Sequence, residues 1–258
     1  MKEVEGFGVT YERYAIGKLL GEIAAKYGIK KILEIPAGGA KAMPSIYSIG
    51  FGLAGCDVYL VNPSERARGV WDGLGLANNV HFVECRDVEN TGLESDSFDL
   101  VWNCIAFPTY GNPNSLLKEM IRISKKYVMT ISVNAYNVGF PWHRFLHRVK
   151  HIPWTHGDIT YNFLGKVGSF FKRYGLKIVK VGVVDTPPWP DSLGFRDIRL
   201  HRMNIDINKT DWHSTIVDYI KQENYPVWLK AIWMFEKLPV PMYLKLPYSH
   251  LFYVLGEK

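Results

Sequence analysis

The sequence predicts an α/β fold built on a doubly wound, seven-stranded sheet. Short apolar segments alternate with longer segments whose apolar residues recur at helical spacing, which is typical of parallel strands joined by crossover helices. Apolar residues make up 47% and charged residues 22% of the 258 residues, which fits a globular domain and excludes a disordered chain. Right-handed crossovers would place a ligand at the carboxyl ends of the strands.

The first predicted element is a helix, which we expect to be capped by Thr10 and to end at Gly28. Within it, an apolar stripe runs from Tyr14 to Ala24 at helical spacing. Strands are expected at residues 31–35, 58–62, 80–85, 98–104, 127–133, 176–184 and 251–256. Further helices are expected up to about residue 54, from residue 63, and at 115–124, 142–149, 161–174 and 227–237.

Charge divides the chain into two unlike parts. Up to Asn134 there are 14 basic and 15 acidic residues, whereas the remainder has 17 and 10 and holds seven of the eight His. No apolar run is long enough to span a membrane, and the first residues lack the apolar core of a secretion signal. The three Cys follow no disulfide or zinc-binding pattern. We therefore expect a cytoplasmic protein, and its single Gln is thermophile-like.

The first candidate for ligand binding is the turn Glu34–Ala40 between a strand and a helix. Its small residues let a ligand approach the backbone, and the following helix offers free N–H groups. The turn lacks the glycine spacing of the dinucleotide motif, and a tight turn without a ligand is an alternative. Asn62, Asp87 and Asn103 lie at or near the ends of the next three strands, so a doubly wound sheet would bring them to the same crevice.

These segments resemble the class I S-adenosylmethionine-dependent methyltransferases, in particular their small-molecule, type 11-like branch. The resemblance covers about Thr10–Asn134 and the closing strand, and it is carried by residues 33–40, 61–62, 85–88, 97–103 and 116–123. It implies a Rossmann-like sheet whose last strand is antiparallel. It also implies S-adenosyl-L-methionine as cofactor and S-adenosyl-L-homocysteine as product.

The resemblance implies roles for individual residues. Glu34 would hold the methionine amino group, Asp87 would accept a hydrogen bond from the adenine amino group, and Tyr14 would close over the methionine carboxylate. The other cofactor-binding positions that it implies are Pro36, Ala37, Gly38, Asn62, Pro63, Val88, Asn103, Cys104 and Ile105. Asn62 departs from the family, which usually has Asp or Glu there for the ribose hydroxyls. This departure favours a second hypothesis, a non-catalytic protein that binds or senses an adenosyl ligand.

The end of the fourth strand excludes one substrate class. Methyltransferases of base amino groups resemble one another in an Asp/Asn-Pro-Pro-aromatic turn at this point, whereas this chain reads Asn103-Cys104-Ile105-Ala106-Phe107-Pro108. No basic residue stands beside Cys104 to activate it, so we interpret Cys104 as an inert buried thiol.

Histidines dominate the segment after the fifth strand. His143, His147 and His151 recur every fourth residue on one helix face, and His156 and Asp158 follow. They could be solvated or capping histidines. Alternatively, one of His143, His147 and His156 could orient the acceptor or take its proton, or His143 and His147 could bind a metal together with His156 or Asp158. We assign the catalytic role to His143, His147 and His156 and no metal, because no Glu lies between them as in H-E-x-x-H.

We interpret residues 1–258 as one domain. Its predicted parts are a cofactor-binding core at 10–134, substrate-facing helices at 135–175, a helical cap insertion at 185–246 and a closing strand at 250–258. The cap is rich in Trp and Tyr and carries Arg196, Arg199 and Arg202. This composition suits an anionic acceptor with an apolar body. Packing of the cap on the sheet, or its contact with a membrane surface, would also use such residues.

The sequence therefore predicts methyl transfer to O, N or C of a small or lipid-like acceptor. RNA methylation is a third hypothesis that rests on the basic second part, and it ranks lower because no RNA-binding module accompanies the sheet.

Overall fold

The computed structural model describes residues 2–38, 45–154, 156–189 and 211–258. Gly39 and Ala40 of the predicted turn lie outside the described residues, as does the arginine cluster predicted in the cap.

The central feature is a seven-stranded sheet in the order β4-β3-β2-β5-β6-β9-β7. β9 pairs antiparallel with both β6 and β7, and the other neighbouring strands pair in parallel. The strands are β2 (Lys31–Glu34), β3 (Asp57–Val61), β4 (Val80–Val83), β5 (Phe98–Cys104), β6 (Ser124–Val133), β7 (Lys177–Val184) and β9 (Leu251–Glu257). This topology confirms the predicted sheet and its antiparallel last strand.

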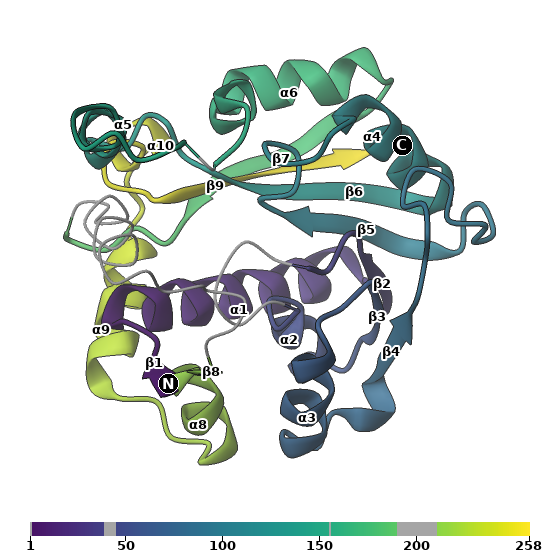
Figure 1. The fold of residues 1–258 in the computed structure, drawn as a ribbon. Helices are drawn as coiled ribbons and strands as arrows, with labels where there is room; N and C mark the ends of the chain where they lie inside the picture. The colour runs from purple at the N-terminus through teal and green to yellow at the C-terminus, as the bar shows by residue number, and fades with distance from the viewer. Residues whose placement is uncertain (1, 39–44, 155, 190–210) are drawn as a thin grey trace.

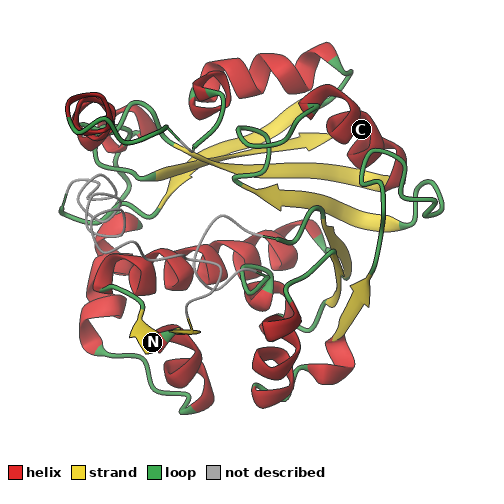
Figure 2. Ribbon diagram, in the orientation of Figure 1, coloured by secondary structure: helices red, strands yellow, loops and turns green. Residues whose placement is uncertain are grey.

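Helices cover both faces of the sheet (Figures 1 and 2). The α-helices are α1 (Phe7–Tyr27), α2 (Ile49–Leu53), α3 (Glu65–Gly73), α4 (Pro113–Ile123), α5 (Gly139–Val149), α6 (Leu164–Arg173), α8 (Thr215–Lys221), α9 (Val227–Glu236) and α10 (Met242–Lys245). The described residues also form two short 3₁₀ helices, η1 (Ala77–Asn79) and η2 (Ile159–Asn162). In the part of the chain that the structure describes, no helix is both long and apolar enough to cross a membrane.

Alternate side chains of the strands supply two separate cores. Ile32 and Trp102 belong to the core shared with α1, whereas Leu33 and Val101 belong to the core shared with α4 and α6. This division follows from the two-residue period of a strand, and it explains why the central strands are apolar on both faces.

The predicted start of the first helix is wrong. α1 begins at Phe7 after Gly6, so Thr10 is not its cap but lies in its first turns, where its hydroxyl donates to the Gly6 carbonyl at 3.4 Å. Packing of the aromatic residues before Thr10 overrides the local capping preference, since Phe7 stacks on Trp228 with ring centroids 4.0 Å apart. The predicted end is confirmed, because Gly28 has a φ of 64° and closes the helix onto the Ala24 carbonyl.

A second, two-stranded sheet was not expected from the sequence. β1 (Lys2–Val4) pairs in parallel with β8 (Asp211–His213), which joins the N-terminus to the insertion between β7 and β9. Next to this ladder, Glu5 is buried and accepts from the Arg13 guanidinium and from the Ser214 hydroxyl. The buried ion pair fixes Glu5 to α1, and the Ser214 hydroxyl attaches the insertion to the same carboxylate.

Candidate functional site

The carboxyl edge of the main sheet carries unusual backbone conformations. Asn62, Ile105 and Asp185 directly follow β3, β5 and β7 and have φ values of 53°, 56° and 59°. Left-handed φ is costly for a β-branched residue such as Ile105, and such residues concentrate at functional sites. This edge is therefore the candidate site, as the predicted topology required.

Glu34, the last residue of β2, is fully buried at this edge. Its Oε2 accepts from the Ser48 hydroxyl at 2.6 Å, and that hydroxyl in turn accepts from the Trp102 indole at 3.0 Å. Its Oε1 is buried and has no hydrogen-bond partner among the described residues. Burial raises the pKa of Glu34 to about 7, although the hydrogen bonds from Ser48 act in the opposite direction.

The turn after Glu34 exposes backbone. The Ala37 amide donates to the Val61 carbonyl at 2.8 Å, and the Ala37 carbonyl accepts from the Ser45 hydroxyl at 2.5 Å, so the turn is fixed to β3. Pro36 is half-buried, whereas Gly38 is exposed. A Cβ at Gly38 would meet no atom within 4 Å among the described residues. The space beside Gly38 allows a ligand to approach the main chain.

The Asn62 side chain pairs with the backbone of Cys85. Its Nδ2 donates to the Cys85 carbonyl at 2.7 Å, and its Oδ1 accepts from the Cys85 amide at 2.8 Å. An Asp could accept from the amide but could not donate to the carbonyl, which gives a structural reason for Asn at this position. Pro63, which follows, is half-buried.

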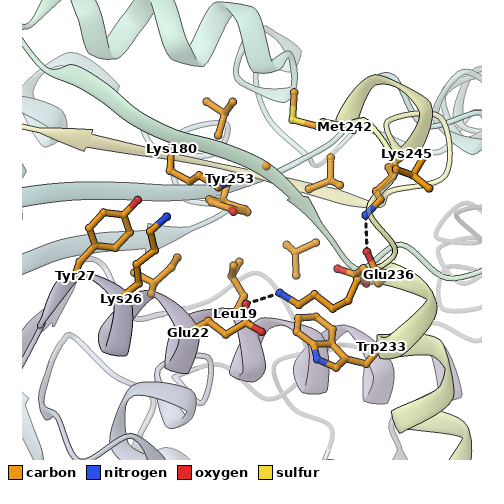
Figure 3. Close-up of a pocket in the computed structure, with 17 residues that line it drawn as sticks. Leu19, Glu22, Lys26, Tyr27, Lys180, Trp233, Glu236, Met242, Lys245 and Tyr253 are labelled. Atoms are coloured by element: carbon orange, nitrogen blue, oxygen red, sulfur yellow. Dashed lines mark hydrogen bonds and ion pairs between the residues drawn. The ribbon is translucent and has the colours of Figure 1, made fainter.

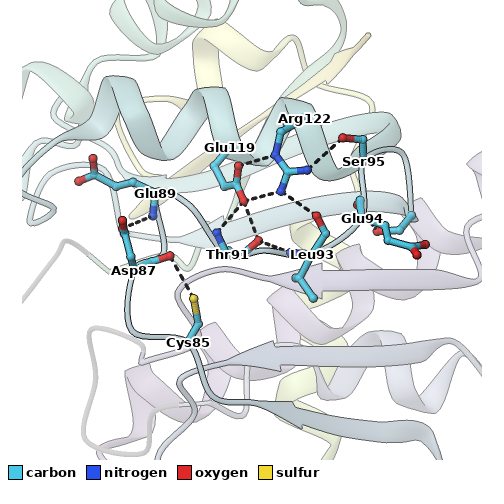
Figure 4. Close-up of polar contacts among 10 residues, drawn as sticks. Cys85, Asp87, Glu89, Thr91, Leu93, Glu94, Ser95, Glu119 and Arg122 are labelled. Carbon is cyan, nitrogen blue, oxygen red and sulfur yellow. Dashed lines mark hydrogen bonds and ion pairs between the residues drawn. The ribbon is translucent and has the colours of Figure 1, made fainter.

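Asp87 lies in an exposed loop after β4 that a buried acid holds in place (Figure 4). The Asp87 Oδ1 accepts from the Glu89 amide at 2.9 Å. Behind this loop, Glu119 of α4 accepts from the Thr91 amide and hydroxyl at 2.9 and 2.6 Å and from Arg122 at 2.8 Å. Burial opposes ionisation of Glu119, but the hydrogen bonds from Arg122 and Thr91 lower its pKa overall. Val88, the neighbour of Asp87, is buried in the α4-side core.

The predicted residues at the end of β5 point to different places. The Asn103 amide is buried on the α4 side, where it accepts from the Thr130 hydroxyl at 2.6 Å and donates to the Met120 sulfur at 3.3 Å. Cys104 is buried in the opposite core with α1. The Ile105 amide donates to the Ile131 carbonyl at 2.7 Å. Ile105 therefore presents its strained backbone at the carboxyl edge, while the Asn103 side chain faces the interior.

Tyr14 is buried on α1, against the insertion. Its ring lies 5.1 Å from that of Tyr225 and 6.4 Å from that of Trp233, measured between centroids. Burial raises the pKa of the Tyr14 hydroxyl. The structure thus places this side chain between α1 and α9, where it lines a groove of about 400 Å³ together with residues of α2 and α8.

A larger pocket of about 460 Å³ lies between α1, β7 and the α9–α10 segment (Figure 3). Lys26, Lys180, Lys237 and Lys245 line it with Glu22 and Glu236. Lys245 donates to the Glu236 and Leu238 carbonyls at 2.6 and 2.8 Å, and Lys237 pairs with Glu22. None of the predicted cofactor-binding residues lines this pocket, so it is separate from the sheet edge at Glu34.

The three predicted catalytic histidines come together. His143 and His147 of α5 are buried, His156 is half-buried, and their ligand-capable atoms all lie within 4.8 Å of one another. His151 is exposed and outside this cluster. The Asp158 carboxylate accepts from the Thr160 amide at 2.8 Å as the cap of η2.

Residues 33–129 match the model of a methyltransferase domain family of type 11. This segment includes Glu34, the turn, Asn62, Asp87 and the end of β5. The match identifies a methyltransferase domain within this chain, in line with the resemblance. The predicted enzyme class, a methyltransferase, is confirmed by this match.

Solved structures support the fold of this methyltransferase. A proposed methyltransferase of Bacillus halodurans is 19% identical with a TM-score of 0.54, and the match covers 94% of this chain and 98% of that one. Magnesium protoporphyrin IX methyltransferase of Synechocystis, with bound S-adenosylhomocysteine, is 14% identical with a TM-score of 0.52 and coverages of 72% and 84%. The [4+2]-cyclase SpnF is 13% identical with a TM-score of 0.53 and coverages of 94% and 80%. Among curated protein sequences, none matches this chain significantly.

Ser48 and Trp102 were not among the predicted site residues, although they fix the orientation of Glu34. Trp102 lies opposite Glu34 in the register of β2 and β5. A sequence alone could have indicated Trp102, because both residues fall near the ends of adjacent strands. Ser48 carries no comparable signal, since it precedes α2 by one residue in an irregular segment.

Proposed function

We propose that this methyltransferase transfers the methyl group of S-adenosylmethionine to O, N or C of a small or lipid-like, anionic acceptor. The observation that carries the proposal is the fully buried Glu34 carboxylate, whose Oε1 has no hydrogen-bond partner among the described residues. A buried carboxylate oxygen without a partner is costly, and a cationic amino group is the partner that best satisfies it. The methionine end of the donor carries such a group.

Several of the other predicted positions would surround the rest of the donor. The backbone of Pro36, Ala37 and Gly38 would lie along the methionine and ribose. Asp87 would accept from the adenine amino group, with the Val88 amide beside the ring. Asn62 has an acceptor and a donor position left after its two bonds to Cys85, so one bond to the ribose is compatible with its geometry.

When bound, S-adenosylmethionine supplies an electrophilic methyl group for in-line transfer. The protein would contribute mainly by positioning the acceptor and excluding water. His143, His147 and His156 are proposed to face the acceptor. The amide of Asp158 donates to the Pro108 carbonyl at 2.7 Å and holds the segment next to His156 against the residues after β5. His156 is the least buried of the three and would accept the acceptor's proton.

Exposed apolar residues support an acceptor with an apolar body. On α5, Trp142 and Phe145 are 49% and 51% exposed and stack on each other. On α9 and α10, Met234 and Tyr243 are 71% and 68% exposed. The start of α5 lies beside the end of α10, since the Val138 amide donates to the Pro247 carbonyl at 2.9 Å. An apolar surface of this kind favours binding of lipid-like molecules over strongly hydrated ones.

The proposal is tested by measuring S-adenosylhomocysteine formation with acceptor fractions from a cell extract, separated into lipid and aqueous metabolites. We expect turnover with the lipid or anionic organic fraction, loss of turnover in Glu34→Gln, and unchanged turnover in Glu94→Gln, whose carboxylate is exposed in the loop after β4. Turnover with RNA alone would replace the small-molecule assignment with RNA methylation.

A second candidate function is an adenosyl-ligand binding or sensing protein without turnover. The bonds between Asn62 and the Cys85 backbone favour it, because they leave less of the side chain for the ribose. This candidate predicts stoichiometric binding of S-adenosylmethionine with no S-adenosylhomocysteine formed in any fraction. Product formation in any fraction would reject it.

A further inference from the structure

We propose that His143, His147 and His156 form a binding site for one divalent transition-metal ion of the zinc class. The site joins the inner face of α5 to the loop that follows it. The proposal goes beyond methyl transfer and does not depend on it, because it rests on the geometry of these three imidazoles alone.

The helix sets the first two ligands. His143 and His147 are one helical turn apart, and their Nε2 atoms lie 3.1 Å from each other. The ring of His156 approaches both, with centroid distances of 4.9 Å to His143 and 5.6 Å to His147. One ligand atom from each residue lies within 4.8 Å of the other two. Two zinc–nitrogen bonds reach at most about 4.2 Å, so a small inward shift of the His156 ring brings all three to one ion.

The hydrogen bonds of His147 fix the tautomer that metal binding requires. Its Nδ1 lies 3.1 Å from the Pro153 carbonyl oxygen and 3.3 Å from that of Ile152. Carbonyl oxygens only accept, so Nδ1 carries the hydrogen and the neutral ring has its lone pair on Nε2. Metal-bound histidines characteristically donate their second N–H to a backbone carbonyl in this way.

The spacing between the two Nε2 atoms is close to that of metal ligands. Zinc–nitrogen bonds of about 2.0–2.1 Å at a tetrahedral angle place two ligand nitrogens about 3.3 Å apart. The observed 3.1 Å is slightly shorter. In the ion-free protein the His143 N–H would donate to the His147 lone pair, and an ion replaces that hydrogen with little movement.

The loop that carries His156 is held in place before any ion binds. Trp154 packs against His143, His147 and His156 with centroid distances of 5.3, 5.2 and 4.8 Å. Its indole donates to the Gly157 carbonyl at 3.0 Å. Gly157 has a φ of 69°, and a Cβ there would lie 1.8 Å from the Pro108 carbonyl oxygen, so only glycine fits. This preorganisation is what a rigid ligand set needs.

Three imidazoles favour Zn²⁺ and its neighbours Co²⁺, Ni²⁺ and Cu²⁺ over Mg²⁺ or Ca²⁺, which prefer oxygen ligands. Three protein ligands leave a fourth position for water or an acceptor group. A bound ion takes up the lone pairs that would otherwise accept a proton, so the metal role and the base role of these histidines are alternatives in the loaded protein.

The test is a titration of tag-free, chelator-treated protein with Co²⁺, followed by its visible absorption and by displacement with Zn²⁺. We expect one equivalent to bind in the wild type. We expect at least tenfold weaker binding in His156→Ala and unchanged binding in His151→Asn. His151 is a matched control because it is exposed, lies in the same segment and has a φ of 51°, which Asn tolerates.

Thermal unfolding with Zn²⁺ or with chelator provides a second readout. Zn²⁺ should raise the Tm of the wild type and of His151→Asn but leave that of His156→Ala unchanged. Failure of the wild type to bind one equivalent of either ion overturns the proposal, as does equal binding by wild type and His156→Ala. Because no methyl donor is present in these experiments, their outcome is separate from that of the methyl-transfer assay.

Discussion

The Ser48 hydroxyl donates to Glu34 Oε2 at 2.6 Å and so fixes the orientation of the buried carboxylate. The other oxygen, Oε1, has no hydrogen-bond partner among the described residues. The buried Glu34 is thus oriented by a neighbour that would not itself touch a ligand. Orientation of this kind makes the free oxygen a fixed recognition element for a cation.

Glu34→Gln should have opposite effects on binding and on stability. Removing the charge should weaken S-adenosylmethionine binding at least tenfold, because the amino group loses its ionic partner. The same change should raise Tm at pH 8, because a buried carboxylate is costly when it is ionised and unpaired. Calorimetric titration and thermal unfolding measure the two effects; a loss of both binding and stability would instead indicate a misfolded variant.

The stability of the ligand-free protein should fall as pH rises from about 4.5 to about 7. Burial raises the pKa of both Glu34 and Glu236 from 4.5 to about 7. Between these values the folded state holds protons that the unfolded state has lost, so the free energy of unfolding decreases by up to roughly 1.4 kcal/mol per pH unit for each carboxyl and levels off above pH 7. Denaturant unfolding across this range should show a shallower decline in Glu34→Gln; identical pH profiles would contradict this assignment.

Asn62→Asp should destabilise the protein by roughly 1–3 kcal/mol, because a carboxylate oxygen would face the Cys85 carbonyl in place of a donor. The left-handed backbone is not the cause, since Asp tolerates it nearly as well as Asn. The change is measured by chemical denaturation. A variant as stable as the wild type would show that the bonds to Cys85 contribute little.

Asp87→Ala should weaken S-adenosylmethionine binding about tenfold, which corresponds to about 1.4 kcal/mol. Glu94→Ala is the matched control, because Glu94 is an exposed acid in the same loop. An Asp87→Ala affinity equal to that of the wild type would remove Asp87 from the proposed adenine site. Equal losses would indicate a general effect of negative charge.

Glu5→Gln should destabilise the protein by roughly 3–5 kcal/mol, because it leaves the buried Arg13 guanidinium without its anion. Hydrogen exchange should then become faster in β1 and β8, which this ion pair fixes to α1. Exchange that changes only at the sheet edge β4 would contradict this role of the pair.

The main sheet was predictable because each of its strands is a short apolar run bounded by turn residues. The β1–β8 ladder was not, since two three-residue strands lie far apart in the sequence and neither shows a periodic pattern. Tertiary packing of Phe7 on Trp228 likewise determined where α1 begins, in spite of the capping preference of Thr10.

The site was predictable at the level of strand ends but not of side-chain direction. Glu34 and Trp102 are paired in register, so their side chains lie on the same face of the sheet. Because successive residues of a strand point to opposite faces, the Asn103 side chain lies on the other face, with Met120 and Thr130. The convergence of His156 on His143 and His147 depends on a turn at Gly157 that packs against Pro108, and no local pattern encodes that contact.

The most direct test of the methyltransferase assignment is calorimetric titration of the wild-type protein with S-adenosylmethionine. The predicted result is saturable one-to-one binding that Glu34→Gln weakens at least tenfold and Glu94→Gln leaves unchanged. Absence of binding by the folded wild-type protein at millimolar S-adenosylmethionine would contradict the account.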